Sequence, residues 1–358
     1  MPRPLDDPDQ IQAIDSHGML GLLSAFPEQC AHGIQMAGGL SFPPHYADST
    51  CMVVAGVGGS AIGGDLLRSY LVDRCPVSLE VSRHYFVPAY VGSKTLVVVS
   101  SYSGETEESL SSYAMAQKQG ANLVVLTTGG RLGDQAAAEG VPMIKLPSGL
   151  PARAALGYSF FGLLAIAEKM GWARPSEGEI AETVQVLSRL RDEQLGPEVA
   201  NTKNRAKILA EALKGRLPVI YADADLSDGV VSRWKTQLAE NAKVLAMGGT
   251  FPEINHNDIV GWGGPSEVAE HQTIVLLRDR EERARIRTRI EISKRLWKSL
   301  DIEVLEVWST GQERLSRMFS LIYTGDFAST YLALLNGMDP TDVSRIDSLK
   351  SELGSWQA

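Results

Sequence analysis

Short runs of valine, leucine and isoleucine recur along this chain and alternate with segments of helical spacing. In the first half, the apolar runs lie at residues 52–55, 77–81, 95–99, 123–126 and 142–146. A strand that is apolar throughout is buried on both faces, as in a parallel sheet covered by helices. Parallel neighbours need crossover connections, and the intervening segments 62–72 and 106–119 have helical spacing. The pattern therefore predicts βαβ units.

The same pattern returns after a long helical stretch. Residues 152–195 carry no strand signal, and apolar runs then recur at 217–221, 273–277 and 302–307. Further helices are predicted at 11–23, 30–36, 204–214, 229–243, 281–300 and 314–335. The expected fold class is α/β, with two domains that each contain a mainly parallel sheet flanked by helices.

The length of 358 residues fits two domains of ~150 residues each. The predicted limits are 1–45 for a helical N-terminal lead-in, 46–150 for the first domain, 151–204 for a helical connector and 205–358 for the second domain, which ends in a C-terminal helix.

Composition narrows the class of protein. Hydrophobic residues make up 44% of the chain and charged residues 22%, proportions that exclude a disordered protein or a coiled coil. The formal charge of −9 argues against nucleic-acid binding, and no apolar run approaches the ~20 residues of a membrane helix. Cys30, Cys51 and Cys75 are odd in number and unpatterned, and the N-terminus is acidic. We therefore expect a cytoplasmic protein without disulfides or a metal site.

A glycine-rich loop follows the first apolar run. Gly58, Gly59 and Ser60 precede a helical segment, and glycines allow a ligand to approach backbone N–H groups at a helix N-terminus. This predicts a phosphate-binding turn. Two alternatives are a tight turn without a ligand and a dinucleotide fingerprint. In the second, Glu80 would close the next strand and bind a ribose, and the protein would be a nicotinamide dehydrogenase.

A second loop favours a phosphate group over a dinucleotide as the ligand. Ser101, Ser103 and Thr106 follow the run at 95–99 and open the next helix. Hydroxyl groups and backbone N–H groups together suit a phosphate monoester. The alternative is that Ser103 and Thr106 only cap the helix. Because the two loops follow neighbouring strands, we favour one small phosphate pocket over an extended dinucleotide site.

These loops resemble those of the sugar isomerase (SIS) fold, together with Thr127-Thr-Gly-Gly-Arg131. Further motifs follow in order: Pro151-Ala-Arg-Ala-Ala155, Glu240-Asn-Ala-Lys243, Asn255-His-Asn257 and Arg345-Ile-Asp-Ser-Leu-Lys350. From about residue 50 to 353, the chain is similar to the bifunctional phosphoglucose/phosphomannose isomerase family. The loops alone also occur in regulators and amidotransferases, whereas the later motifs are more specific.

The resemblance implies an aldose–ketose isomerase that converts hexose 6-phosphates through an enediol, without metal or cofactor, in glycolysis and gluconeogenesis. It implies that Glu240 is the base between C2 and C1, that His256 and Lys350 assist ring opening, and that Arg153 stabilises the enediolate. Ser60, Ser101, Ser103 and Thr106 would hold the phosphate. It further implies a homodimer in which the histidine reaches the partner's site. The alternative is a non-catalytic sugar-phosphate-binding regulator on the same fold, which would need none of Glu240, His256 and Lys350.

The chain departs from the family pattern at two places. Glu105 stands where relatives usually carry asparagine, which places a negative charge beside the expected phosphate site. Its effect depends on whether the carboxylate turns towards the phosphate. Val343-Ser344 stands where some relatives have Thr-Pro, in a loop linked to acceptance of the mannose epimer. This departure therefore concerns activity on mannose 6-phosphate and leaves the expected activity on glucose 6-phosphate unchanged.

The spacing of the candidate catalytic residues gives separate information. Arg233, Gln237 and Glu240 share one face of a predicted helix, which forms either a functional row or a solvated salt-bridging face. Arg153 follows a proline at a helix start, where a cation is unfavourable and needs an anion. Lys350 is expected to close a helix that starts at about Val343, where a cation simply stabilises the helix dipole.

The candidate histidine lies in a polar context. His256 sits between two asparagines, which indicates a loop, and a lone loop histidine is often only a surface residue. The segment Ile259-Val-Gly-Trp262 that follows is apolar. It would either anchor a subunit interface or pack onto its own domain.

Overall fold

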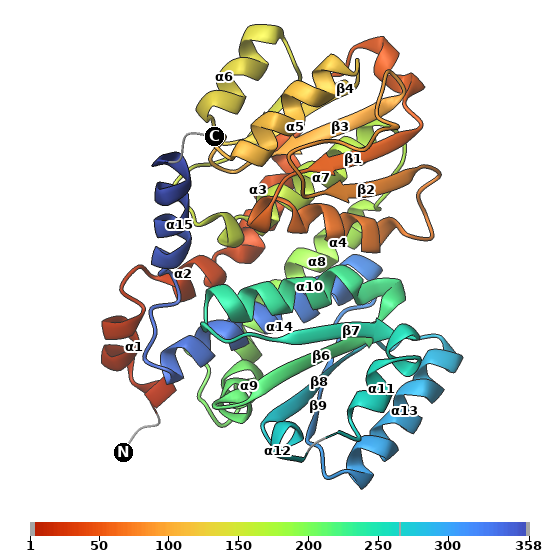
Figure 1. Ribbon diagram of the computed structural model, residues 1–358. Helices are drawn as coiled ribbons and strands as arrows, with labels where there is room; N and C mark the ends of the chain where they lie inside the picture. Colours follow the sequence, from red (N-terminus) through yellow and green to blue (C-terminus); the bar gives the residue numbers. More distant parts are fainter. Residues whose placement is uncertain (1–3, 265, 356–358) are drawn as a thin grey trace.

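The computed structural model describes residues 4–264 and 266–355 and contains two parallel sheets, one above the other in Figure 1. The first, sheet A, has the order β2 (Ser78–Ser82), β1 (Cys51–Ala55), β3 (Thr95–Ser100), β4 (Asn122–Thr127) and β5 (Met143–Lys145). The second, sheet B, has the order β7 (Met247–Phe251), β6 (Leu217–Asp223), β8 (Gln272–Arg278) and β9 (Val304–Trp308). Every pairing in both sheets is parallel, so the predicted fold class is confirmed.

The central strands of sheet A, β1, β3 and β4, are buried on both faces, as their unbroken apolar residues predict, whereas the edge strand β2 is partly exposed. Its helices are α4 (Ile62–Leu71), α5 (Glu107–Lys118), α6 (Gly130–Glu139) and α7 (Leu156–Lys169). Val54 and Val98 pack in one core with residues of α4 and α7, whereas Val53 and Val97 pack in another with Tyr113 of α5. Alternate residues of each strand therefore face different helix layers.

Sheet B has the same organisation. Its larger helices are α9 (Arg205–Leu213), α10 (Ala224–Glu240), α13 (Ala284–Ser299) and α14 (Arg314–Leu335), and the short helices α11 (Asp258–Gly261) and α12 (Ser266–Ala269) lie after β7. Ile220 and Val275 face the core that contains α10 and α14, whereas Val219 and Ile274 face Trp297 of α13.

A layer of helices joins the two sheets (Figure 1). Helix α4 packs on α10, α10 packs on α14, and α8 (Glu177–Leu190) packs along α14. At the crossing of α4 and α10, a Cβ on Gly229 would lie 2.9 Å from the carbonyl oxygen of Asp65, so only glycine allows this approach. Residues 314–334 of α14 are all buried, which makes this helix the centre of the molecule.

The N-terminal helices differ from the prediction. The single helix expected at 11–23 is wrong, because α1 (Pro8–Ile14) and α2 (Met19–Ser24) are separate helices. Gly18 has a φ of +72° between them, and the Asp15 carboxylate accepts hydrogen bonds from the N–H groups of Met19 and Leu20, at 2.7 and 2.9 Å. Helix α3 (Phe26–Met36) begins four residues earlier than predicted.

The limits of the four predicted segments, 1–45, 46–150, 151–204 and 205–358, stay a prediction.

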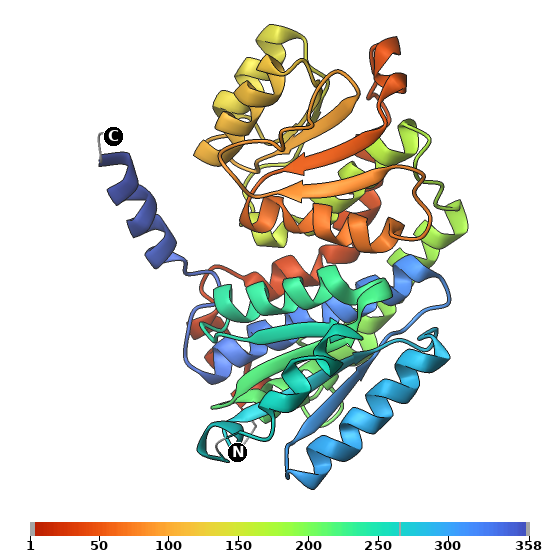
Figure 2. The same ribbon diagram turned by 45° about the vertical axis from the view of Figure 1, so that its right-hand side comes forward.

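The C-terminal helix α15 (Ser344–Ser355) stands away from the rest of the chain (Figure 2). It contains no buried residue, and Ile346, Leu349 and Leu353 are exposed along it. The prediction that Lys350 closes this helix is wrong, because the helix continues for five residues beyond it. Among the described residues, none of the helices combines the length and apolar character needed to cross a membrane.

The N-terminus of α10 gives a testable pH dependence. Asp223 is buried, its side chain accepts a hydrogen bond from the N–H group of Asp225 at 3.1 Å, and burial raises its pKa from 3.8 to about 6. A raised pKa in the folded state means that the carboxyl group stabilises the fold below pH 3.8 and loses this contribution as pH rises through 6.

We therefore expect Asp223→Asn to stabilise the protein by up to about 3 kcal/mol at pH 7.5, since two pKa units correspond to roughly that energy. Asparagine caps a helix as well as aspartate does. Urea unfolding at pH 7.5 and pH 4 measures the effect, which should nearly vanish at the lower pH. Equal stability of the variant and the wild type at pH 7.5 would contradict this account.

Candidate active site

The two predicted phosphate loops meet at the carboxyl end of sheet A. The loop after β1 forms the 3₁₀ turn η3 (Gly58–Ser60), and the loop after β3 starts at Ser101. The Ser60 hydroxyl accepts a hydrogen bond from the N–H group of Tyr102 at 2.9 Å, and the Ser60 carbonyl accepts one from the Ser100 hydroxyl at 2.9 Å. Because β1 and β3 are paired neighbours, the loops are held side by side.

The hydroxyl groups of the second loop are ordered by one another. The Ser101 hydroxyl donates to the Thr106 hydroxyl at 3.0 Å and accepts from the N–H group of Gly104 at 3.1 Å. Ser103 is exposed, and its hydroxyl accepts from the N–H group of Glu105 at 3.2 Å. Thr106 is the N-cap residue of α5, but its side chain accepts no hydrogen bond from the helix. The alternative that Thr106 serves as a side-chain cap is therefore wrong.

A third loop, after β4, closes against the second. Gly104 has a φ of +72°, and a Cβ there would lie 1.8 Å from the carbonyl oxygen of Gly129, so this contact requires glycine. The Glu105 carboxylate turns to this loop, where it accepts from the N–H group and from Nε of Arg131, both at 2.8 Å. These contacts lower the pKa of Glu105. The charge that departs from the family pattern is thus paired with arginine.

The dinucleotide alternative finds no support in the position of Glu80. This residue is the third of five in β2, not the last, and its carboxylate accepts a hydrogen bond from the Tyr90 hydroxyl at 2.6 Å. An acid that binds ribose should follow the end of the strand. The prediction that Glu80 closes the strand is wrong.

Arg153 lies next to the phosphate loops because of a glycine contact. A Cβ on Gly59 would lie 2.8 Å from the backbone nitrogen of Arg153, in the 3₁₀ turn η4 (Ala152–Ala154). The Arg153 side chain is only 5% exposed, and burial lowers its pKa. It donates from Nε to Asn241 at 2.8 Å and from Nη1 to Glu240 at 3.4 Å. Glu240 is therefore the anion that Arg153, a cation at a helix start, was predicted to need.

The row on α10 is buried rather than solvated. Arg233 and Gln237 are each 2% exposed, so the alternative of a salt-bridging surface is wrong. Arg233 donates two hydrogen bonds to Asp326 of α14, at 2.8 and 3.0 Å, and a third to the carbonyl oxygen of Arg153 at 2.8 Å. Glu240, the last residue of α10, is 26% exposed and therefore accessible to a ligand.

Several residues that hold Arg153 and Glu240 in place were not predicted from the sequence. The Lys243 ammonium donates to the carbonyl oxygens of Glu240 and Asp339, at 2.8 and 2.7 Å. Nη2 of Arg153 donates to the carbonyl oxygens of Pro340 and Thr341, at 2.7 and 3.1 Å. The segment that leads into α15 is thereby fixed to both candidate catalytic residues.

His256 and Lys350 are not brought to Glu240 within the chain. Helix α10 spans about 25 Å from the carboxyl end of β6 to the start of β7, so Glu240 lies at the amino end of sheet B. His256 follows the 3₁₀ turn η6 (Glu253–Asn255), which lies between β7 and α11 at the opposite end of the sheet, and it is exposed. Figure 1 shows α11 at that end. Lys350 is exposed on α15, which stands away from the body (Figure 2). Val343, just before α15, is half-buried.

The apolar segment after His256 divides between two environments. Trp262 is buried in its own domain and donates from Nε1 to the Tyr221 hydroxyl at 3.2 Å. Val260 is 76% exposed. The tryptophan therefore packs onto its own domain, and only part of the segment remains for a partner.

Comparisons with known proteins identify the family of the chain. The model of the bacterial phospho-glucose isomerase C-terminal SIS domain matches residues 202–353. The chain is 46% identical over 327 residues to a bifunctional phosphoglucose/phosphomannose isomerase of Caldicellulosiruptor bescii, covering 91% of this chain and 96% of the relative. It is 34% identical to the protein of that name from Thermoplasma acidophilum, covering 84% and 89%.

A solved structure shares the fold. The glucose-6-phosphate isomerase like protein from Thermus thermophilus superposes with a TM-score of 0.63 at 23% identity, covering 95% of this chain and 98% of that one. The sequence relatives extend over nearly the whole of both chains, including the loops of sheet A and the end of α10. The chain belongs to the bifunctional phosphoglucose/phosphomannose isomerase family.

Proposed function

We propose that this protein is an aldose–ketose isomerase that interconverts glucose 6-phosphate and mannose 6-phosphate with fructose 6-phosphate. The observation that carries the proposal is the Arg153–Glu240 contact of 3.4 Å, which lies beside two hydroxyl-lined loops at the carboxyl end of a parallel sheet. Family membership supports the same reaction. We place the activity in the cytoplasm, in glycolysis and gluconeogenesis.

The proposed mechanism assigns one role to each element. The hydroxyl groups of Ser60, Ser101, Ser103 and Thr106 and the nearby N–H groups hold the phosphate. Glu240 moves a proton between C2 and C1 of the open-chain sugar. The guanidinium of Arg153 stabilises the negative charge that develops on the enediolate oxygen, because a fixed cation in a desolvated site acts strongly on such charge.

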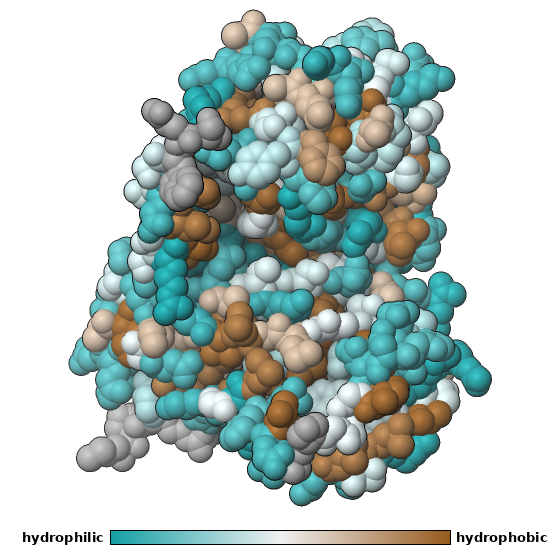
Figure 3. Space-filling view, in the orientation of Figure 1, coloured by the Kyte–Doolittle hydropathy of each residue, from teal (hydrophilic) through white to brown (hydrophobic). Residues whose placement is uncertain are grey.

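Ring opening is assigned to His256 and Lys350. Because neither lies beside Glu240 in its own chain, we propose a homodimer in which His256 completes the site of the partner. Exposed apolar side chains support an interface on the second domain, since they gather over α11 to α13 at the lower right of Figure 3. Those side chains are Val260, Val268, Ile292, Leu296 and Leu300.

A product assay tests the proposed reaction. Purified protein, treated exhaustively with a chelator, is incubated with fructose 6-phosphate, and the products are separated by chromatography. We expect glucose 6-phosphate and mannose 6-phosphate, because side chains supply the base and the cation. A non-catalytic regulator would bind the sugar phosphate and return it unchanged. Activity that is lost in chelator and restored by a divalent ion would contradict the mechanism.

The phosphate loop gives a binding prediction. We expect Ser101→Ala combined with Ser103→Ala to weaken the affinity for a sugar-phosphate inhibitor, because each lost hydrogen bond to a charged group costs ~1.5–3 kcal/mol. Calorimetric titration measures the change. Ser111→Ala is the matched control, since this serine lies on α5 and donates to the carbonyl oxygen of Tyr85. Unchanged affinity in the double variant would show that the loop does not hold phosphate.

A further inference from the structure

A cavity of about 550 Å³ lies at the carboxyl end of sheet B, and none of its lining residues belongs to the candidate active site. Its walls come from α8, from the turn after β8 and from the loop between β9 and α14. Ligands of α/β proteins bind at the carboxyl ends of parallel strands, and small-molecule sites have volumes of ~300–1,000 Å³. Place and size therefore both suit a ligand.

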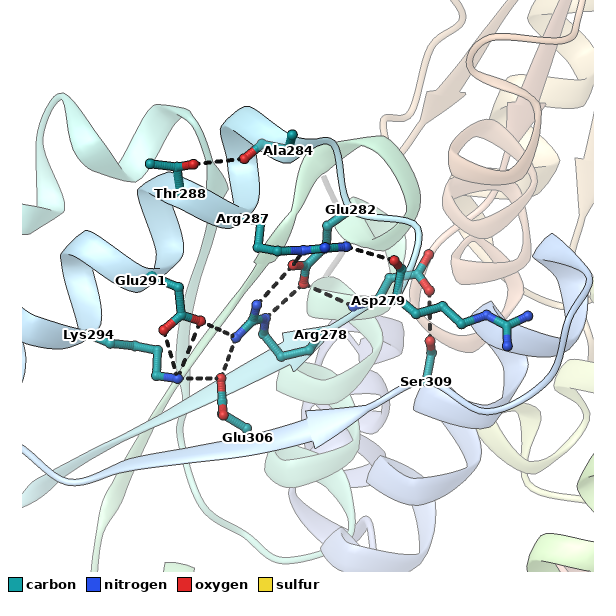
Figure 4. Close-up of polar contacts among 11 residues, drawn as sticks. Arg278, Asp279, Glu282, Ala284, Arg287, Thr288, Glu291, Lys294, Glu306 and Ser309 are labelled. Atoms are coloured by element: carbon teal, nitrogen blue, oxygen red, sulfur yellow. Dashed lines mark hydrogen bonds and ion pairs between the residues drawn. The ribbon is translucent and has the colours of Figure 1, made fainter.

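The charged groups next to the cavity are already paired (Figure 4). Arg278, at the end of β8, donates to Glu282 at 2.8 and 3.0 Å and also pairs with Glu291 and Glu306. Asp279 accepts from the Ser309 hydroxyl at 2.7 Å. Of the residues in these contacts, only Ser309 lines the cavity.

One wall of the cavity is the N-terminus of α14. The carboxylate of Glu182, from α8, occupies the position at this N-terminus where a bound anion would otherwise lie. Its carboxylate accepts from the N–H groups of Gln312 and Glu313, at 2.5 and 3.1 Å. Gly311 has a φ of +114°, and a Cβ there would lie 2.1 Å from the Ser316 hydroxyl, so the loop needs glycine to adopt this shape. The α14 dipole and these N–H groups thus offset the negative charge of Glu182.

The remaining polar groups of the cavity have few partners. Within the part of the chain that the structure describes, the side chains of Arg189, Gln185 and Thr310 make no hydrogen bond or ion pair. Arg280 donates from Nη2 to Gln312, and its Nε lies 3.8 Å from a Glu281 carboxylate oxygen. Two guanidinium groups therefore face the cavity against one carboxylate that the α14 N-terminus already neutralises.

We propose that this cavity binds a small phosphate compound at a second site, separate from the isomerase site. Arg189 and Arg280 pair with the phosphate oxygens, because guanidinium groups match the geometry of phosphate. The Thr310 hydroxyl and the Gln185 amide donate further hydrogen bonds. The proposal depends on neither Glu240 nor the loops of sheet A, so it stands or falls separately from the proposed reaction.

The test measures binding of inorganic phosphate by calorimetry in the Ser101→Ala/Ser103→Ala background, which disables the loop of sheet A. In this background we expect one saturable phosphate site. Adding Arg189→Gln should weaken it at least about tenfold, the effect of losing one charge-assisted hydrogen bond. Adding Glu182→Gln should tighten it several-fold, because glutamine keeps an oxygen for one of the two α14 N–H groups and removes the negative charge. Arg174→Gln, a substitution of an exposed arginine outside the cavity, should change nothing.

Arg189→Gln should weaken phosphate binding and Glu182→Gln should strengthen it. A variant with a damaged fold would not bind phosphate more tightly, so these opposite changes in affinity distinguish loss of a binding group from misfolding. Alone in the otherwise wild-type chain, Arg189→Gln should leave the isomerase kcat and KM unchanged. No saturable phosphate binding in the background, or equal affinity in the Arg189→Gln and Arg174→Gln variants, would overturn the proposal. Weaker binding in Glu182→Gln would overturn it as well.

Discussion

Replacement of Glu240 by glutamine should lower the turnover of fructose 6-phosphate at least ~10²-fold, since general acid–base groups typically contribute 10²–10⁴-fold to rate. Glutamine keeps the size of the side chain and an oxygen for Arg153, which lies 3.4 Å away. The buried contacts of Arg153 with Asn241 and Pro340 do not involve the Glu240 carboxylate. The site should therefore stay assembled and lose only its base.

Steady-state kinetics and inhibitor titration together measure this effect. The affinity for a sugar-phosphate inhibitor should remain close to the wild-type value, because the phosphate loops are unchanged. Glu267→Gln, on the exposed surface of α12, is the matched control and should keep full turnover. Near-normal turnover in Glu240→Gln would show that another group is the base.

Mixing two inactive variants should restore activity if the sites are shared. We expect Glu240→Gln and His256→Ala to be nearly inactive as separate homodimers. After subunit exchange, each heterodimer contains one site with both wild-type residues. An equal mixture of the two chains should then reach roughly a quarter of the wild-type activity, since half of the dimers carry one intact site of two. The positions of Glu240 and His256 at opposite ends of sheet B motivate this expectation.

The control for this experiment is a direct measurement of exchange, for example by native mass spectrometry of subunits that differ in mass. If heterodimers form and activity stays at the level of the single variants, each site is self-contained. His256 would then act within its own chain or have no role in catalysis.

The strands that are apolar throughout could be predicted from the sequence. A strand with helices on both faces is buried at each position, and this produces a continuous apolar run. Strand β7 was not predicted, since Met-Gly-Gly-Thr-Phe lacks branched side chains. The structure explains the glycines: a Cβ on Gly248 would lie 2.6 Å from Val231 of α10. Because helix α10 packs closely on this strand, glycines stand where the other strands have branched apolar residues, and the strand has no apolar run. Helix α6 was also missed; it starts with Gly-Arg-Leu-Gly and has no side-chain cap.

The candidate site was partly visible in the sequence. The helical spacing of Arg233, Gln237 and Glu240 placed them on one face, but spacing does not tell a buried face from a solvated one. Asp326 offered a usable signal, because a lone acid inside a long apolar helix needs a buried cation, and Arg233 is that cation. The carbonyl partners of Lys243 and Arg153 could not be predicted, since any residue can supply a backbone oxygen.

The central claim is that Glu240 carries a proton between C1 and C2 of the sugar, and isomerisation in D₂O tests it most directly. Glu240 is 26% exposed, so the proton on its carboxyl group can exchange with water during the reaction. Incubation of fructose 6-phosphate with the protein in D₂O, followed by NMR of the products, should give glucose 6-phosphate and mannose 6-phosphate with deuterium at C2. The Glu240→Gln variant should give neither product at a comparable rate. Absence of any aldose 6-phosphate, or deuterium-labelled aldose products formed by Glu240→Gln at the wild-type rate, would contradict the account.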